Sequence, residues 1–363
     1  MELSTLPLSI HGNLEYINFR FQFNLLFFFL LLSYFYVFLT IVLTLRMVEH
    51  FRKPRALNSS VHVHRSVFLT FVWMQSANLL FYILDNVVFR IPPTGLLTSW
   101  LAASSPKLFL KLTYFFLLIS NYFSTFFSFL FCLIRLIVVY FPGSQQKVGH
   151  FSWLAPEDKR VLHQKISRTF VLYIPLSAFL PFLFTLFFLP ATVYCRQISA
   201  PYPFGAVYFS YVGAWHNIYY DPFNVFVNFS AAFSILCING ALLRKIRSLM
   251  MRRTRSSRYL RAEVSLTLMT LTMNIPFLAN VGMTVSSSLS SKTSMFPQAT
   301  SFLDASKSAY TLLPRQVASD VGLVAVPWIF YLTHPMFRPM NPTSRTVSHG
   351  SSGNKIGGSE SKV

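Results

Sequence analysis

Charged residues are scarce in this 363-residue chain, and acidic residues are the scarcest. Only 12% of the residues are charged, and Asp and Glu together number 11. Soluble domains carry about 25% charged residues, so an ordinary water-soluble protein is excluded. Hydrophobic residues make up 53% of the chain and include 40 phenylalanines. Such a chain needs lipid around it, and we expect a multi-pass membrane protein.

Patterns typical of catalysis and metal binding are missing as well. The three cysteines (Cys132, Cys195 and Cys237) are too few for a disulfide framework and show no metal-ligand spacing. There is no Gly-rich phosphate loop and no nucleophile elbow, and the nine histidines are scattered. Residues 1–20 lack the basic start and short apolar core of a cleavable signal peptide. We therefore expect no enzyme, no cofactor and no metal site.

Long uncharged runs stand in place of these patterns. The central run lies between Lys111 and Arg135 and holds 23 residues. At ~1.5 Å per residue it forms about 35 Å of helix, enough to cross a hydrocarbon core roughly 30 Å thick. Runs of this kind predict an all-α bundle of seven transmembrane helices, at residues 21–45, 66–89, 112–134, 169–194, 222–243, 264–285 and 318–337. Residues 339–363 are rich in Ser and Gly and are expected to form a disordered tail.

The formal net charge of +20 is distributed unevenly along the chain. If successive loops alternate between the two sides, 23 of the 31 Lys and Arg residues share a side with the C-terminus. The positive-inside rule then places the N-terminus outside and the C-terminus in the cytosol. The basic residues form short clusters without a recognition helix, so we do not expect nucleic acid as a partner. The densest cluster, 244–261, fits attraction to anionic lipid as well as docking of a cytosolic signalling protein.

Polar residues are expected in the outer half of the bundle. For any one of them the simpler explanation is that its side chain snorkels to the interface or forms hydrogen bonds between helices. Together they predict an aromatic-lined cup that is open to the outside, the usual form of a small-molecule site. Charges within membrane spans are also functional candidates by default. The candidate ligand-binding residues are Asp85, Lys111, Asn121, Asn228, Asn280 and Asp320.

Arg135 stands at the inner end of the third span, seven residues before Pro142. It is either a residue that snorkels to the interface or the moving part of a switch. Its neighbour Ile134 is not acidic, so Glu263 at the start of the sixth span is the candidate partner. We expect this location to be partly wet, where an ion pair contributes about 1 kcal/mol. An ion pair of that strength shifts a finely balanced equilibrium but does not lock the bundle in its inactive state, so we expect measurable basal activity in the parent protein.

With seven spans, an outside N-terminus and Arg135, the chain resembles a G protein-coupled receptor. More closely, it is similar to a nematode serpentine chemoreceptor of class gamma. The likeness rests on RMVEHFRKPRALNSS after the first span, RIPPTGLLTSW between the second and third, RLIVVYFP after the third, and the closing VPWIFYLTHPMFR.

The resemblance implies a chemosensory receptor in the plasma membrane of sensory cells. Its partners would be the lipid bilayer, a small-molecule ligand and a heterotrimeric G protein. It gives Arg135 the position that couples to the G protein and places helix kinks at Pro276 and Pro327. We assign Arg244, Lys245, Arg247 and Glu263 to the same coupling surface.

A transporter or a ligand-gated channel subunit is the alternative function. Transporters often contain internal repeats, and an odd number of spans without a visible repeat is less typical of them. Insect-type odorant channels also have seven spans, but in the opposite orientation, so the charge distribution argues against them. A purely structural membrane protein is a third hypothesis.

Overall fold

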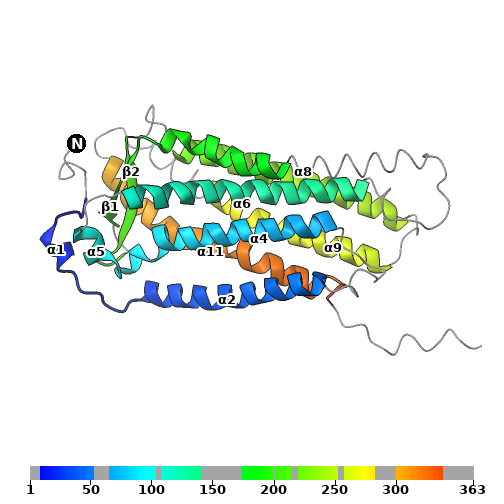
Figure 1. Ribbon diagram of the computed structural model, residues 1–363, viewed down its shortest axis with the longest axis horizontal. Helices are drawn as coiled ribbons and strands as arrows, with labels where there is room; N and C mark the ends of the chain where they lie inside the picture. Colours follow the sequence, from blue (N-terminus) through cyan, green and yellow to red (C-terminus); the bar gives the residue numbers. More distant parts are fainter. Residues whose placement is uncertain are drawn as a thin grey trace, which may run out of the picture.

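The computed structural model describes residues 9–52, 65–103, 108–140, 173–198, 202–213, 220–251, 257–282 and 300–337. Long helices lie side by side along one axis, with a small hairpin at one end (Figure 1). The predicted tail at 339–363 lies outside the described residues. The long helices are α2 (Leu25–Arg52), α4 (Arg65–Asp85), α6 (Leu108–Tyr140), α8 (Tyr220–Met251), α9 (Ser257–Thr272) and α11 (Thr300–Thr333).

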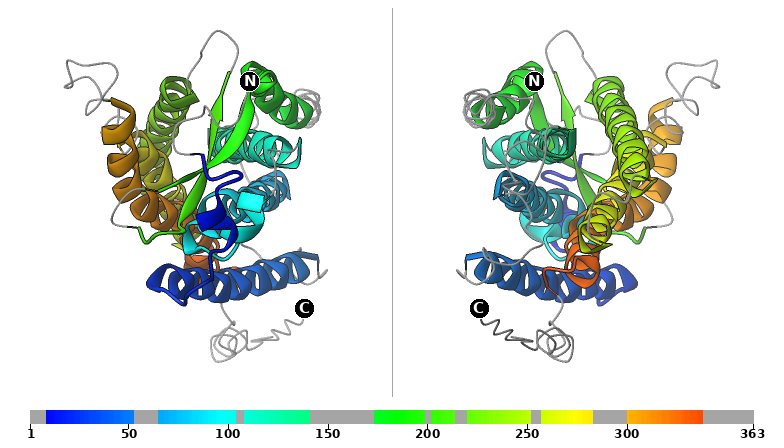
Figure 2. Two further views of the ribbon diagram at one scale, coloured as in Figure 1. Left: turned by 90° about the vertical axis from the view of Figure 1, so that its left-hand side faces the viewer. Right: turned by 90° about the vertical axis from the view of Figure 1, so that its right-hand side faces the viewer.

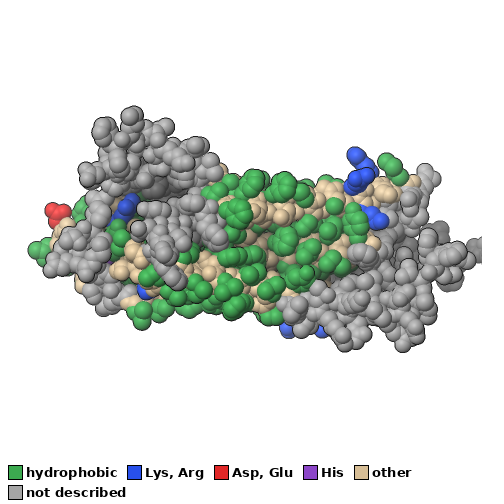
Figure 3. All heavy atoms as spheres, turned by 90° about the horizontal axis from the view of Figure 1, so that it is seen from above, with side chains coloured by type: hydrophobic (Ala, Val, Ile, Leu, Met, Phe, Trp, Pro, Cys, Tyr) green, Lys and Arg blue, Asp and Glu red, His purple; other side chains and the backbone are tan. Residues whose placement is uncertain are grey.

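The described part of the chain contains six helices that are long and apolar enough to cross a membrane. A seventh apolar helix, Tyr173–Phe188, is shorter. Apolar side chains remain exposed on these helices, and Leu25, Phe35 and Phe226 are 68%, 64% and 67% exposed. On the face shown in Figure 3, apolar side chains form a broad band across the middle of the molecule, with Lys and Arg nearer its ends. Apolar surface of this extent marks contact with lipid, which fits the predicted seven-helix membrane bundle.

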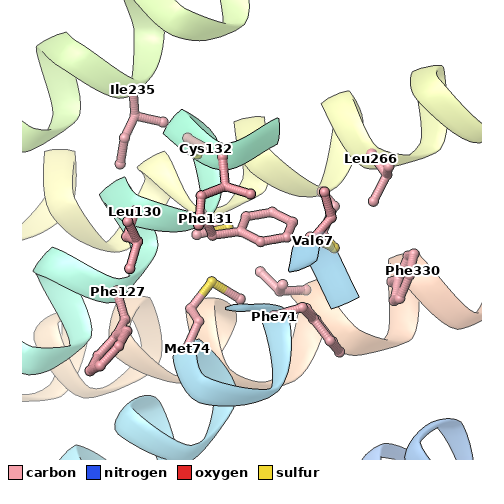
Figure 4. Packing of buried hydrophobic residues seen from close by; sticks show 14 of the residues in the cluster. Val67, Phe71, Met74, Phe127, Leu130, Phe131, Cys132, Ile235, Leu266 and Phe330 are labelled. Atoms are coloured by element: carbon pink, nitrogen blue, oxygen red, sulfur yellow. The ribbon is translucent and has the colours of Figure 1, made fainter. Parts of the chain in front are cut away.

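The interior of the bundle is closely packed with apolar side chains. Phe71 of α4, Phe131 of α6, Ile235 of α8 and Phe330 of α11 belong to one buried cluster (Figure 4). Each is at most 1% exposed. Because these side chains come from four helices far apart in the sequence, the cluster joins the bundle into one body.

The two ends of the bundle differ. One end carries the antiparallel strands β1 (Thr192–Gln197) and β2 (Val207–Val212), together with the short helices α1 (Leu14–Ile17) and α5 (Thr98–Ala103). We call it the hairpin end. The opposite end, where α6 ends and α9 begins, is called the basic end because Arg244, Lys245 and Arg247 of α8 lie toward it.

A glycine in the hairpin end is required by its surroundings. Gly205 lies between the two strands with φ of +88°, and a Cβ added there would overlap the ring of Phe19. A side chain at this position is excluded both by the left-handed backbone and by the ring. Gly205 therefore lets the segment before α2 pack directly against the hairpin.

Several predicted boundaries need correction. The fourth span was predicted to end at residue 194, but its helix ends at Phe188 and β1 begins at Thr192. The seventh span was predicted at residues 318–337, and α11 is longer than that span at its N-terminal end, where it begins at Thr300. Polar residues before the span thus continue the helix beyond the apolar region that hydropathy detects.

The prolines assigned to kinks affect their helices differently. α9 ends at Thr272, a turn follows at Met273, and a further helical stretch reaches residue 282. Pro276 has no N–H to bond the carbonyl of Thr272, which accounts for the interruption. α11 instead continues through both Pro314 and Pro327.

Candidate functional site

A π-helical turn at the end of α4 builds the centre of the candidate site. It spans Asn86–Arg90 and follows Asp85 directly. In an α-helix, residues five apart point about 140° away from each other. The wider π turn brings Arg90 back over Asp85, and Arg90 Nε donates to Asp85 Oδ2 at 2.9 Å. Turns of this kind are rare and frequently occur at functional sites.

Arg90 also binds Asp320 of α11 through its two terminal guanidinium nitrogens. Nη1 donates to Asp320 Oδ2 at 2.9 Å, and Nη2 donates to Oδ1 at 2.6 Å. The hydroxyl of Tyr36 in α2 donates to the same carboxylate. Asp85, Arg90 and Asp320 are all buried. Two-pronged bonds between charged groups fix orientation as well as contributing energy, so this cluster ties α2, α4 and α11 together.

A second arginine completes the charge balance. Arg315 Nη2 lies 3.7 Å from Asp85 Oδ1, and the guanidinium stacks 4.5 Å over the ring of Phe89. The side chain of Arg315 is 26% exposed, whereas that of Arg90 is 5% exposed. Two carboxylates and two guanidinium groups therefore leave the cluster without formal net charge.

The sequence predicted both acids but missed both arginines. Arg90 and Arg315 lie near the ends of apolar runs, and from the sequence alone they contributed only to the count of Lys and Arg that set the orientation in the membrane. The signal that could have identified Arg90 is its spacing from Asp85, but five residues is not a pairing distance in an α-helix. The π turn creates the pair, and hydropathy does not reveal that turn.

A narrow polar cavity lies beside the Arg90–Asp320 pair. Its volume is about 50 Å³, room for a few water molecules. Most of the residues that line it are polar, and the aromatic rings of Phe81, Tyr82 and Phe277 line it as well. The polar residues that line it are Asn78, Tyr82, Arg90, Asn121, Ser124, Ser128, Asn228, Asn280, Arg315, Ser319 and Asp320.

The six candidate ligand-binding residues take different places. Four of them line this cavity, namely Asn121, Asn228, Asn280 and Asp320. Asp85 lies behind the cavity and is bound to Arg90. Lys111 is half-buried on α6 and lines neither this cavity nor the larger groove described below. Lys111 is therefore separate from the group that the fold brings together.

The hairpin end is covered, contrary to the predicted open cup. The strands, α1 and α5 lie across that end of the bundle (Figure 2). Ile10 N donates to the carbonyl of Cys195 at 3.1 Å, and Gly12 N donates to that of Ala102 at 3.0 Å. The hydroxyl of Thr98 donates to the carbonyl of Gly205. These bonds join three separate segments into one cover, which the sequence missed because the hairpin itself was not predicted.

Arg135 forms a second polar site toward the basic end. Its Nη2 donates to the carbonyl of Glu263 at 2.7 Å, to Glu263 Oε2 at 3.2 Å and to the hydroxyl of Thr267. Nη1 donates to the hydroxyl of Thr270 at 3.2 Å. Arg135 is 1% exposed, so the predicted partly wet location is wrong. A cation bound by three residues of α9 clamps α6 to that helix.

The other candidate coupling residues lie on α8. Arg244 and Arg247 are exposed, and Lys245 Nζ lies 5.2 Å over the ring of Tyr140 at the end of α6. Residues 252–256 of the basic cluster lie outside the described residues. Exposed cations beside the ends of α6 and α9 give this face of the basic end a positive charge.

Comparison with known proteins identifies the family. Residues 10–340 match the family of serpentine type 7TM GPCR chemoreceptors named Sru. Serpentine receptor class U-26 of Caenorhabditis elegans is 32% identical over 290 residues, which cover 77% of this chain and 90% of that protein. Both matches are to class U, whereas the sequence motifs suggested class gamma. The motifs did not separate these related classes because short stretches of apolar helix are too alike. The chain belongs to the Sru family of serpentine seven-transmembrane chemoreceptors.

Proposed function

We propose that this chemoreceptor binds a small molecule beside the Arg90–Asp320 pair and signals to a heterotrimeric G protein at the basic end. The observation that carries the proposal is that the sixth span contributes to both sites. Met273, Pro276 and Asn280 line the polar cavity. Glu263 and Thr267, on the same span, bind Arg135.

The interruption at Met273 lies between these two groups of residues. A helix that is broken near its middle can change direction there, because the backbone bond that Pro276 removes no longer resists bending. A ligand that displaces the segment 274–282 would therefore shift the Arg135 contacts at the other end. Such a ligand acts only through a difference in its affinity for the two arrangements.

The proposal includes an orientation and a location. The hairpin end faces the outside and the basic end faces the cytosol, as the distribution of Lys and Arg favours. The exposed side chains of Arg244 and Arg247 then face the G protein and the anionic inner leaflet. Membership of a chemoreceptor family supports the plasma membrane of a sensory cell.

The test is nucleotide exchange on a set of G proteins in cells that express the full chain, challenged with volatile and lipid-like compounds. We expect at least one compound to stimulate exchange. Asn121→Ala, in the cavity, should raise the effective concentration of that compound. Ser76→Ala is the control, because Ser76 is exposed on α4 and bonds only its own helix at Val72.

Arg135→Ala should abolish exchange while labelled-ligand binding and surface delivery persist. If compounds evoke ion currents without exchange on any G protein, the protein is a channel subunit and the proposal fails. If Arg135→Ala signals normally, coupling does not depend on this arginine.

A further inference from the structure

A second and much larger cavity lies between α2 and α11. Its volume is about 620 Å³, within the usual range for small-molecule sites. Apolar side chains dominate its walls, including Leu26, Phe29, Leu30, Val321, Val324 and Ala325. We call it the α2–α11 groove.

The mouth of the α2–α11 groove opens on the apolar band. Phe29 and Leu32 of α2 are each 45% exposed, and Val317 of α11 is 64% exposed. All three line the groove, and all lie within the membrane-spanning lengths of their helices. The groove therefore opens toward lipid tails rather than toward water.

The deep side of the groove is polar. Ser33, Tyr36, Arg90 and Asp320 line it there. Arg90 and Asp320 also line the polar cavity, so their ion pair forms the partition between the two spaces. A molecule lying in the groove would place one end against the pair that we propose as the ligand site.

The charge balance defines the polar end of the occupant. Among the described lining residues of the groove, only Arg90 and Asp320 are charged, and each already binds the other through two hydrogen bonds. A charged head group would remain buried beside them without a partner, at a high cost in free energy. An uncharged head with a hydroxyl or amide can instead bond the hydroxyl of Tyr36 or an oxygen of Asp320.

The covered hairpin end indicates the route. Access from water on that side meets the hairpin, α1 and α5, whereas the groove meets lipid directly. We propose that the ligand is a neutral amphiphile that enters sideways from the bilayer between α2 and α11. Its apolar part occupies the groove and its uncharged polar head rests on Tyr36 and Asp320. This inference rests on the proposed receptor function and specifies the class of ligand.

The test is photolabelling of the purified full-length protein in lipid nanodiscs, without any G protein. The probe is a long-chain alcohol that carries a diazirine in its chain, compared with the carboxylic acid and the amine of equal chain length. Peptide mass spectrometry locates the labels. We expect the alcohol to label α2 and α11 at the groove, saturably and in competition with the unlabelled alcohol, and to do so more than either charged probe.

Two variants place a bulky ring in the groove, Ala325→Phe and Val321→Phe. Each should reduce the saturable labelling about tenfold, a loss consistent with a steric clash of this size. Ala231→Phe is the matched control, since Ala231 is a half-buried alanine of α8 that lines neither cavity. Size-exclusion profiles show which variants fold.

Labelling that spreads evenly around the apolar band, or that persists in both folded groove variants, would overturn the inference. Stronger labelling by the acid or the amine would overturn the assignment of a neutral head. Because no G protein is present, these outcomes are separate from a failure of the proposed signalling function. A receptor that binds the alcohol but does not couple would refute that function alone.

Discussion

The Arg135 clamp leads to the most specific prediction about signalling. If activation separates the basic ends of α6 and α9, weakening the clamp should raise exchange without any ligand. Arg135 Nη2 lies 3.2 Å from Glu263 Oε2. At this distance two unit charges attract by about 5 kcal/mol when the effective dielectric constant is about 20. Desolvation offsets part of this attraction, and about 2 kcal/mol is a reasonable net value.

A change of this size is easily measured. Glu263→Gln removes the charge and retains a hydrogen-bonding side chain of similar shape. A loss of about 2 kcal/mol changes the equilibrium about 30-fold, which moves a receptor that is about 1% active to roughly a quarter active. The sequence alone predicted measurable basal activity in the parent, because it assumed a partly wet pair. The buried clamp predicts a quiet parent instead.

Two threonines of α9 provide a matched control. Thr267 and Thr272 both donate to the carbonyl four residues earlier, at 2.8 Å and 3.0 Å. Only Thr267 also accepts a hydrogen bond from Arg135. Thr267→Val should therefore raise basal nucleotide exchange about tenfold, the effect of losing one bond to a charged group. Thr272→Val should leave it unchanged. The reasoning is refuted if Glu263→Gln and Thr267→Val are both as quiet as Thr272→Val.

Three further predictions concern packing, reactivity and topology. A Cβ on Gly322 would lie 2.9 Å from Cγ of Pro276, so Gly322→Ala should lower the thermal unfolding midpoint. Gly240→Ala is the control and should leave the midpoint unchanged, because a Cβ on Gly240 would meet no atom within 4 Å. Burial raises the pKa of Cys195 to about 12, so about one thiol in ten thousand is ionised at pH 8. Iodoacetamide should therefore leave Cys195 unmodified at pH 8. Modification at that pH would show that the hairpin end opens. An N-terminal epitope should be detected on intact cells, and one after Val363 only after permeabilisation; the reverse result would contradict the proposed orientation.

The long helices could be predicted from the sequence, because uncharged apolar runs leave few alternatives in lipid. The hairpin could have been predicted but was not. Thr192–Gln197 and Val207–Val212 are rich in β-branched and aromatic residues and flank a turn that contains Pro203 and Gly205, which is a typical hairpin signal. That signal was hidden because the apolar start of the first strand adjoins the fourth span.

The candidate site could be predicted only in part. Asn121 and Asp320 were found because polar groups stand out in apolar helices, and Glu263 was proposed for Arg135 because few acids exist. The bond between Arg90 and Asp320 joins residues 230 positions apart. It depends on the π turn and on the early start of α11, and neither follows from the periodicity of a regular α-helix.

The π turn at Asn86–Arg90 has a consequence for how receptors of this kind diversify. A π turn holds one residue more than the α-helical turn it replaces, so deletion of one residue would restore an ordinary helix. The arginine would then stand four residues after Asp85, which is still on the same face of an α-helix. The packing of α4 before the turn would be unchanged. A single-codon deletion within the turn could thus occur among such receptors without separating the cation from Asp85 and without rebuilding the membrane bundle.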